Sequence, residues 1–266
     1  MLTDYHLHTT FSLDGHQTPE ELCRRAEALG VRYLAITDHV DVRPTRDNRI
    51  FDILDPVAYR KGIDRLKEDF PRLSIQRGME MGYIPEWWSE ILTRIQTVQP
   101  QFVLGSLHFV GLYDPYDDEY WEHRTRKQGY DDYLHLLNTA VDSLSKVAQA
   151  LAHFDYCSKF VKFPDPELRY EDHADLVDPI LQKLIRADMA LEINTSGYKS
   201  RPAPLPGPSI LARYYKLGGR KIVFGSDGHY TEFVAYEMER AHRLARDIGF
   251  TRHSVWIDGQ ERQFSL

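Results

Sequence analysis

The stretch Asp4-Tyr5-His6-Leu7-His8 predicts a short strand that carries two ionisable side chains. Successive side chains of a strand point to opposite faces of the sheet, so His6 and His8 would lie on the same face. Two imidazoles on one face form a pair of ligands for a metal ion. Such a strand needs further strands beside it, and the rest of the chain supplies them.

A helix is predicted after this strand. Thr18 suits the N-cap position, Pro19 the first helical residue, and Glu21 the third, where its side chain completes a capping box. Gly30 follows the predicted end of the helix, where a left-handed backbone is favoured. The chain therefore begins with a strand followed by a helix.

Short apolar runs alternate with segments of helical period along the remaining chain. This alternation is typical of βαβ units with a parallel sheet. The predicted strands cover residues 4–8, 33–36, 73–77, 102–104, 150–152, 190–193 and 221–224. Further helices are predicted at 133–148, 174–187, 209–217 and 233–248, and a terminal hairpin at 255–264. We expect one domain over residues 1–266, because no Pro/Gly/Ser-rich linker divides the chain.

The composition is that of a folded globular protein. Of the 266 residues, 42% are hydrophobic and 27% are charged, which disfavours disorder. Lysine and arginine total 33 against 40 acidic residues, and the net charge of −7 argues against binding of nucleic acid or anionic lipid. No apolar run reaches the length of a membrane span, and the first residues lack a signal-peptide pattern. We expect a cytoplasmic protein without nucleic-acid or membrane partners.

Histidine is abundant and cysteine is scarce. The chain has 12 histidines but only Cys23 and Cys157, which form no C-x-x-C pair, so neither a zinc ribbon nor a disulfide framework is indicated. This ratio favours imidazole and carboxylate ligands. Five histidines are expected to be surface or structural residues: His123, His135, His173, His242 and His253.

Histidine or carboxylate residues lie within or directly after six of the seven predicted strands. Alone, each is most simply a core histidine, a turn residue or a helix cap. In a barrel of parallel strands, however, the carboxyl ends of several strands surround one active site. Burial of nine such side chains around one mouth is costly without cations, and nine ligands exceed the needs of one tetrahedral ion. The candidate metal ligands are His6, His8, Asp14, His39, Glu80, His108, His153, Asp227 and His229.

Two or three divalent ions are therefore predicted as cofactors. Nitrogen and oxygen ligands of this kind accept manganese, iron and zinc, and the sequence does not choose among them.

Six ordered motifs resemble those of the polymerase and histidinol phosphatase (PHP) superfamily, and the match covers nearly the whole chain. They are His6-Leu7-His8, Thr37-Asp38-His39, Gly78-Met79-Glu80, Gly105-Ser106-Leu107-His108, Ala152-His153 and Gly225-Ser226-Asp227-Gly228-His229. The length of the chain and residues 4–16 further resemble the histidinol-phosphatase branch of that superfamily.

The resemblance implies an α/β fold, a distorted TIM-like (β/α)7 barrel, with a trinuclear metal site at the carboxyl ends of its strands. Carried over position by position, it implies one ion held by His6, His8, Glu80 and Asp227, a second by Asp14, His39 and His229, and a third by Glu80, His108 and His153. Glu80 would then bridge two ions.

The implied activity is that of a metal-dependent phosphomonoesterase in histidine biosynthesis, which converts L-histidinol phosphate and water to L-histidinol and phosphate. We expect a metal-bridging hydroxide to attack phosphorus in line. The leaving alkoxide would take its proton from Asp38, from a site histidine such as His39 or His229, or from water. Asp38 and Asp155, which neighbour candidate ligands, could instead support an imidazole.

Several residues are candidates for binding the small phosphate ester. Lys159 and Arg201 follow predicted strands toward the same face and could bind phosphate, and His16 lies just beyond Asp14. Weaker candidates for the phosphate are Arg43, Arg46 and Arg49, and acidic candidates for the cationic end of histidinol phosphate are Asp41, Asp117 and Asp118.

Other interpretations remain open at the level of sequence. A PHP phosphoesterase could act on another small phosphate, a nucleotide or phosphotyrosine, and PHP modules also accompany polymerases. An amidohydrolase-type barrel shares the H-x-H motif but usually adds a carboxylated lysine, for which no equivalent is evident. Residues 41–55 and 112–130 are long loops that could be lids or surface excursions. A homo-oligomer is compatible with the sequence.

Overall fold

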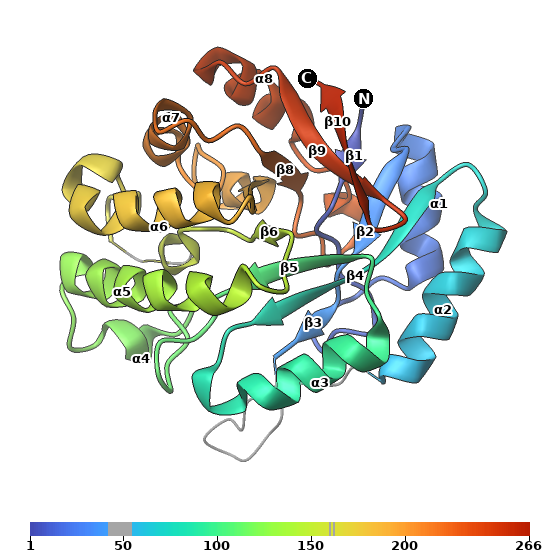
Figure 1. The fold of residues 1–266 in the computed structure, drawn as a ribbon, viewed down its shortest axis with the longest axis horizontal. Helices are drawn as coiled ribbons and strands as arrows, with labels where there is room; N and C mark the ends of the chain where they lie inside the picture. Colours follow the sequence, from blue (N-terminus) through green and yellow to red (C-terminus); the bar gives the residue numbers. More distant parts are fainter. Residues whose placement is uncertain (42–54, 160, 162) are drawn as a thin grey trace.

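A parallel sheet forms the centre of the protein. The computed structural model describes residues 1–41, 55–159, 161 and 163–266. The strands are β1 (Thr3–Asp4), β2 (Tyr33–Ile36), β3 (His39–Val40), β4 (Ser74–Gly82), β5 (Phe102–Ser106), β6 (Ala150–Leu151), β7 (Ala190–Asn194) and β8 (Ile222–Gly225). They lie in the order β1-β2-β4-β5-β6-β7-β8, with β3 paired beside β4 (Figure 1). All seven predicted strands are present, and β3 is an addition.

The two ends of this sheet meet. The amide of Tyr5 donates to the carbonyl of Phe224 at 2.9 Å, and Leu7 forms a parallel bridge with Gly228. The predicted first strand is only partly regular. Strand β1 ends at Asp4, and the residues after it bond to the loop after β8 on one side and to Thr37, directly after β2, on the other. The result is the expected distorted, nearly closed barrel.

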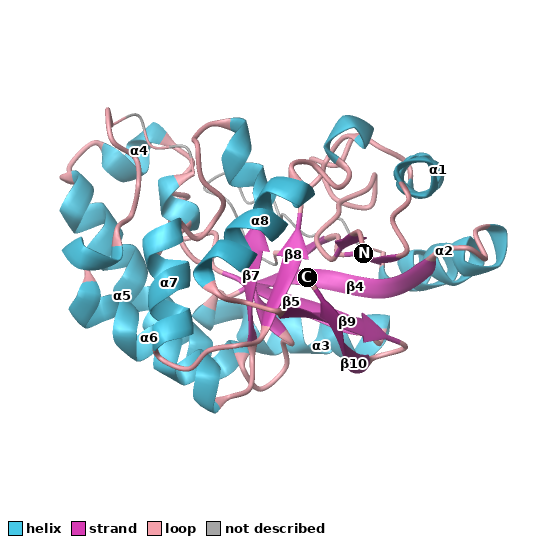
Figure 2. Ribbon diagram, turned by 90° about the horizontal axis from the view of Figure 1, so that it is seen from above, coloured by secondary structure: helices cyan, strands magenta, loops and turns pink. Residues whose placement is uncertain are grey.

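Helices cover the outside of the barrel (Figure 2). They are α1 (Pro19–Leu29), α2 (Pro56–Asp69), α3 (Trp88–Val98), α4 (Asp118–Trp121), α5 (Arg126–Leu144), α6 (Ala174–Arg186), α7 (Pro208–Lys216) and α8 (Met238–Ile248). Short 3-10 turns are η1 (Pro85–Trp87), η2 (Tyr156–Ser158), η3 (Tyr170–Asp172), η4 (Thr195–Lys199) and η5 (Thr231–Phe233). Their buried apolar faces form one continuous core with the outer face of the sheet.

The predicted ends of α1 are confirmed. The Thr18 side chain accepts the amide of Glu21, the Glu21 side chain accepts the amide of Thr18, and Gly30 adopts the left-handed conformation with φ of 76°.

Two of the predicted helices differ clearly from the prediction, and the helix predicted at 133–148 also ends earlier, at Leu144. Helix α5 begins at Arg126, inside the expected loop 112–130, because Thr125 and Gln128 form a second capping box. Helix α8 begins only at Met238, since Glu237 before it has a φ of 52° and cannot continue a helix. Of the other expected loop, residues 42–54 lie outside the described residues, as do Arg43, Arg46 and Arg49.

The predicted terminal hairpin is present as β9 (Arg252–Ile257) and β10 (Gln260–Ser265), paired antiparallel. Trp256 packs on Phe102, with ring centroids 4.8 Å apart, and its carbonyl accepts the hydroxyl of Tyr5. The amide of Asp258 donates to Gln76 near the start of β4 at 2.7 Å. The hairpin therefore closes the amino ends of the strands and leaves the carboxyl ends to the site.

Candidate metal centre and substrate cavity

The predicted metal ligands converge at the carboxyl ends of the strands. A cavity of about 440 Å³ opens there. Seven of the nine candidates line it: Asp14, His39, Glu80, His108, His153, Asp227 and His229. The other two, His6 and His8, are fully buried beneath it. Residues from six strands or the loops directly after them are thus brought to one place, as the topology of a parallel barrel requires.

Glu80 occupies the middle of this cluster. Its Oε1 lies 2.7 Å from Nε2 of His153 and 3.1 Å from Nε2 of His108. Its Oε2 lies 3.1 Å from Nε2 of His6 and 3.4 Å from Nε2 of His8. The two carboxylate oxygens therefore face different imidazoles, which is the arrangement expected of a carboxylate shared by two ions.

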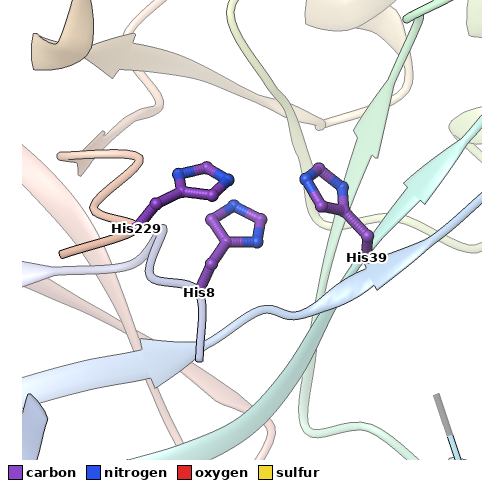
Figure 3. Close-up of side chains that lie close together, drawn as sticks. All are labelled: His8, His39 and His229. Carbon is purple, nitrogen blue, oxygen red and sulfur yellow. The ribbon is translucent and has the colours of Figure 1, made fainter. Parts of the chain in front are cut away.

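A second group lies toward the mouth of the cavity. The His8 ring stacks with His229 at 4.1 Å and with His39 at 4.3 Å between centroids (Figure 3). Asp14 approaches from the loop after β1, with Oδ2 3.2 Å from Nε2 of His229 and 3.7 Å from Nε2 of His39. The Asp14 side chain is 56% exposed, so this group is wetter than the one around Glu80.

The chemistry of these side chains fits divalent cations. Nε2 of His8 is buried without a hydrogen-bond partner, and burial together with the neighbouring His229 and His39 holds the pKa of His8 well below its usual value. His8 is therefore a neutral imidazole, the form that binds metal. Groups of three ligand atoms lie within 4.8 Å of one another, among them His6 with His8 and Glu80.

The assignment of ligands to individual ions stays a prediction. His8 belongs to a group with Glu80 and to another with His39 and His229, and His6 also groups with His153 and Asp227. The same side chain therefore belongs to more than one possible group of three ligands, so the geometry does not assign each ligand to one ion.

Two carboxylates that sequence reasoning did not assign to this role hold the candidate ligands in place. Oε1 of Glu192 accepts Nδ1 of His6 at 2.6 Å, and Oδ2 of Asp41 accepts Nδ1 of His108 at 2.9 Å. Each bond fixes the proton on Nδ1 and turns Nε2 toward the centre of the cluster. The signal for Glu192 was a charged residue inside the apolar strand β7 (Ala190–Asn194).

Comparison with known proteins agrees with this geometry. The family model of the PHP domain matches residues 4–196. The chain belongs to the PHP domain family. A histidinol-phosphatase of Lactococcus lactis subsp. lactis is 28% identical over 250 residues, which are 93% of this chain and 91% of that protein. A histidinol-phosphatase of Bacillus subtilis is 26% identical, and the match covers 89% of this chain and 96% of that protein.

A solved structure has the same PHP fold. The histidinol phosphate phosphatase from Lactococcus lactis subsp. lactis, crystallised with zinc, L-histidinol and phosphate, superimposes with a TM-score of 0.88 at 24% identity over 98% of both chains. No helix among the described residues of this PHP protein is long and apolar enough to cross a membrane.

Asp38 does not reach the cavity of this PHP barrel. Its carboxylate is fully buried and accepts the amide and hydroxyl of Thr9 and the hydroxyl of Ser12, at 2.7 to 2.8 Å. Burial raises the pKa of Asp38 to about 6. Ser12 in turn accepts the amide of His39, so Asp38 braces the loop after β1. This placement does not support the expected role of Asp38 as proton donor to the leaving group.

Arg201 is also placed away from the cavity. Its guanidinium is buried and donates to Asp155 at 2.9 Å and to Ser158 at 2.6 Å. Asp155 therefore supports an arginine instead of an imidazole. The expectation that Arg201 binds phosphate is not supported, because Arg201 does not line the cavity and its Nη1 and Nη2 donate to internal partners.

Two lysines supply the positive charge of the cavity wall. Lys159 lines the cavity, as its position after a predicted strand indicated, and its Nζ lies 2.5 Å from Oδ2 of Asp227. Lys199, which sequence reasoning missed, lines the same cavity at the end of η4, and burial lowers its pKa to about 8. His16 lies at the mouth, where its ring stacks on Tyr230 with centroids 4.4 Å apart.

Proposed function

We propose that this PHP protein is a metal-dependent phosphomonoesterase that hydrolyses L-histidinol phosphate to L-histidinol and phosphate in histidine biosynthesis. The observation that carries the proposal is Glu80, whose two oxygens face five imidazoles at the floor of a cavity that also contains two lysines. The relatives that cover most of the chain are histidinol-phosphatases, which supports this substrate among phosphate esters.

The proposed cofactors are two or three divalent ions of manganese, iron or zinc. The nine side chains at the carboxyl ends of the strands would hold them, with Glu80 shared. When bound, such ions lower the pKa of water and neutralise charge on the phosphoryl oxygens. This supply of charge is needed because phosphate monoesters are among the slowest substrates to hydrolyse without a catalyst.

The side chains of the cavity divide the remaining tasks. Lys159 and Lys199 bind phosphoryl oxygens, since both side chains line the cavity. Lys159 is held beside Asp227, so its charge is already positioned before a substrate arrives. Glu192 and Asp41 keep His6 and His108 in one tautomer. His16, next to Tyr230, borders the entrance for the substrate.

His39 and His229 line the mouth of the cavity. We assign them to catalysis because they lie where the ester bond of the substrate would be cleaved. Each side chain is 19% exposed, so a bound ester can contact both. With Asp38 enclosed by the loop after β1, a site histidine or water is the proton source for the leaving alkoxide.

We further propose that residues 1–266 act as one unit in the cytoplasm. The terminal hairpin supports this view, because Val255 and Trp256 complete a buried cluster with Tyr5 and Phe102 from the barrel.

The test combines metal analysis with phosphate release. The purified protein should contain two or three equivalents of divalent metal and release phosphate from L-histidinol phosphate faster than from a nucleotide, phosphotyrosine or glycerol phosphate. A chelator should abolish the activity, and added metal should restore it. Asp227→Asn should lose at least about 100-fold in turnover while it stays folded. Wild-type turnover in that variant would refute the metal assignment, and a fully metallated protein without phosphatase activity would refute the function.

A further inference from the structure

The cavity contains a carboxylate that the metal cluster does not use. Five acidic residues line the cavity: Asp14, Asp41, Glu80, Asp114 and Asp227. Four of them contact candidate ligand histidines. Asp114, in the loop between β5 and α4, forms no ion pair with a lysine, arginine or histidine of the described part of the chain. The Asp114 carboxylate therefore lines the cavity without supporting a candidate metal ligand.

The hydrogen bonds of Asp114 fix its orientation. Oδ1 accepts the amide of Tyr116 at 2.8 Å and the hydroxyl of Tyr156 at 3.2 Å. Neither bond uses the second oxygen, Oδ2. Burial raises the pKa of Asp114 to about 6, so the group is mainly ionised at pH 7.5. A partly desolvated carboxylate of this kind gains most from a cation that binds beside it.

Tyr156 links Asp114 to the metal cluster. The Tyr156 ring lies 5.1 Å from the rings of both His108 and His153, and its hydroxyl reaches Asp114. The Tyr156 side chain therefore spans the distance between the cluster and Asp114. A ligand with its phosphate at the cluster would need about the same length to bring its other end to Asp114. Phe109 and Tyr116 line the cavity on the same loop, and aromatic faces favour cations.

The acidic residues expected from sequence to meet the cationic end either pair with a candidate ligand or lie outside the cavity lining. Asp41 is committed to His108 and lies 3.5 Å from Nδ1 of His39. Asp117 and Asp118 are exposed and do not line the cavity.

We propose that Asp114, with the rings of Tyr116 and Tyr156, forms a specificity subsite for a cationic group of the substrate. The subsite selects phosphomonoesters whose alcohol carries an amine or imidazole over esters of uncharged alcohols. This inference rests on the proposed phosphatase function and names what distinguishes its substrates. A purely structural role, in which Asp114 only shapes the loop through the amide of Tyr116, is the alternative that an experiment must separate.

Asp114→Asn separates the two roles, because an asparagine oxygen can still accept both hydrogen bonds while the charge is lost. The ratio of kcat/KM for cationic esters, L-histidinol phosphate and phosphoethanolamine, to that for glycerol 3-phosphate is measured in the metallated enzyme. Loss of one charged contact should lower this ratio roughly 10- to 100-fold. Asp117→Asn removes the same charge from the exposed part of the loop and should leave the ratio at the wild-type value.

The outcomes are distinct. An unchanged ratio in Asp114→Asn, or a wild-type enzyme without preference for cationic esters, would overturn the subsite. A wild-type enzyme that prefers phosphoethanolamine but does not hydrolyse L-histidinol phosphate would overturn the proposed substrate and leave the subsite standing. Because the ratio compares two substrates on one preparation, partial loss of folded enzyme does not affect it.

Discussion

Oε1 of Glu192 lies 2.6 Å from Nδ1 of His6, and both side chains are fully buried. Oε2 of the same carboxylate accepts the amide of His153 at 2.7 Å. Glu192 therefore connects two candidate ligands that belong to different strands. Gly225 makes room for it, since a Cβ at that position would lie 2.2 Å from Oε1.

Glu192→Gln should weaken metal binding. Glutamine keeps the size of the side chain but removes the charge that stabilises the His6 N–H, so we expect a roughly 10- to 100-fold loss in metal affinity. Titration calorimetry of the metal-depleted protein measures this directly. Glu90→Gln, an exposed change on α3, is the control. Equal affinity in Glu192→Gln and Glu90→Gln would show that Glu192 does not position a ligand.

Lys199→Met should weaken the binding of inorganic phosphate as a competitive inhibitor. The variant removes one charged donor from the cavity wall, which is worth a roughly 10- to 100-fold rise in the inhibition constant. Lys216→Met removes the same charge from an exposed position on α7 and serves as the control. If both variants keep the wild-type inhibition constant, Lys199 does not contact phosphate.

Arg201→Met should act on stability instead of phosphate binding. The change leaves Asp155 buried without its cation, and breaking a buried ion pair costs about 3–5 kcal/mol of unfolding free energy. Denaturant titration checks this value, and Asp155→Leu added to Arg201→Met should recover part of the loss. A raised inhibition constant for phosphate with unchanged stability would instead place Arg201 in the substrate site.

Acid should destabilise the protein through His242 and His253. Both are buried beside Phe224, and burial lowers their pKa values to about 4 and about 3. The unfolded chain binds these protons near pH 6.5 and the folded chain does not, so stability falls as the pH drops from about 6.5 toward 3. At pH 5 each histidine costs about 2 kcal/mol relative to neutral pH.

His253→Gln should make this pH dependence shallower by about 2 kcal/mol between pH 7 and pH 5. The exposed variant His123→Gln should follow the wild-type curve. The comparison uses the difference in unfolding free energy between variant and wild type at each pH, so that the contribution from protonation of the metal ligands cancels. Parallel curves for wild type and His253→Gln would disprove the assignment.

Much of the fold could be predicted because it depends on local patterns. The apolar runs that became the seven barrel strands and the capping box of α1 are visible in short windows. The start of α8 could not be predicted, because the left-handed backbone at Glu237 interrupts an apolar stripe that reads as continuous helix. Helix α5 was shortened in the prediction because its first turn is polar, and only the pair Thr125 and Gln128 marks its start.

The site could be predicted only in part. Residues directly after strands, such as Glu80 and Asp227, converge by topology alone, since parallel strands end at the same edge. Three-dimensional packing, in contrast, decides which of several neighbouring basic side chains faces the cavity. Sequence proximity favoured Arg201, yet Asp155 and Ser158 occupy its donors, and Lys199 two residues earlier lines the cavity instead.

The amide of Asp227 donates to the carbonyl of His6 at 2.8 Å, which brings two distant parts of the chain together within the metal cluster. A growing polypeptide that has not yet reached Asp227 holds only fragments of this cluster. Complete assembly of the centre is therefore a step that follows synthesis of most of the chain. In the proposed metal-dependent enzyme, the ions around the newly closed barrel would compete for this centre, and their relative abundance would contribute to which of them is retained.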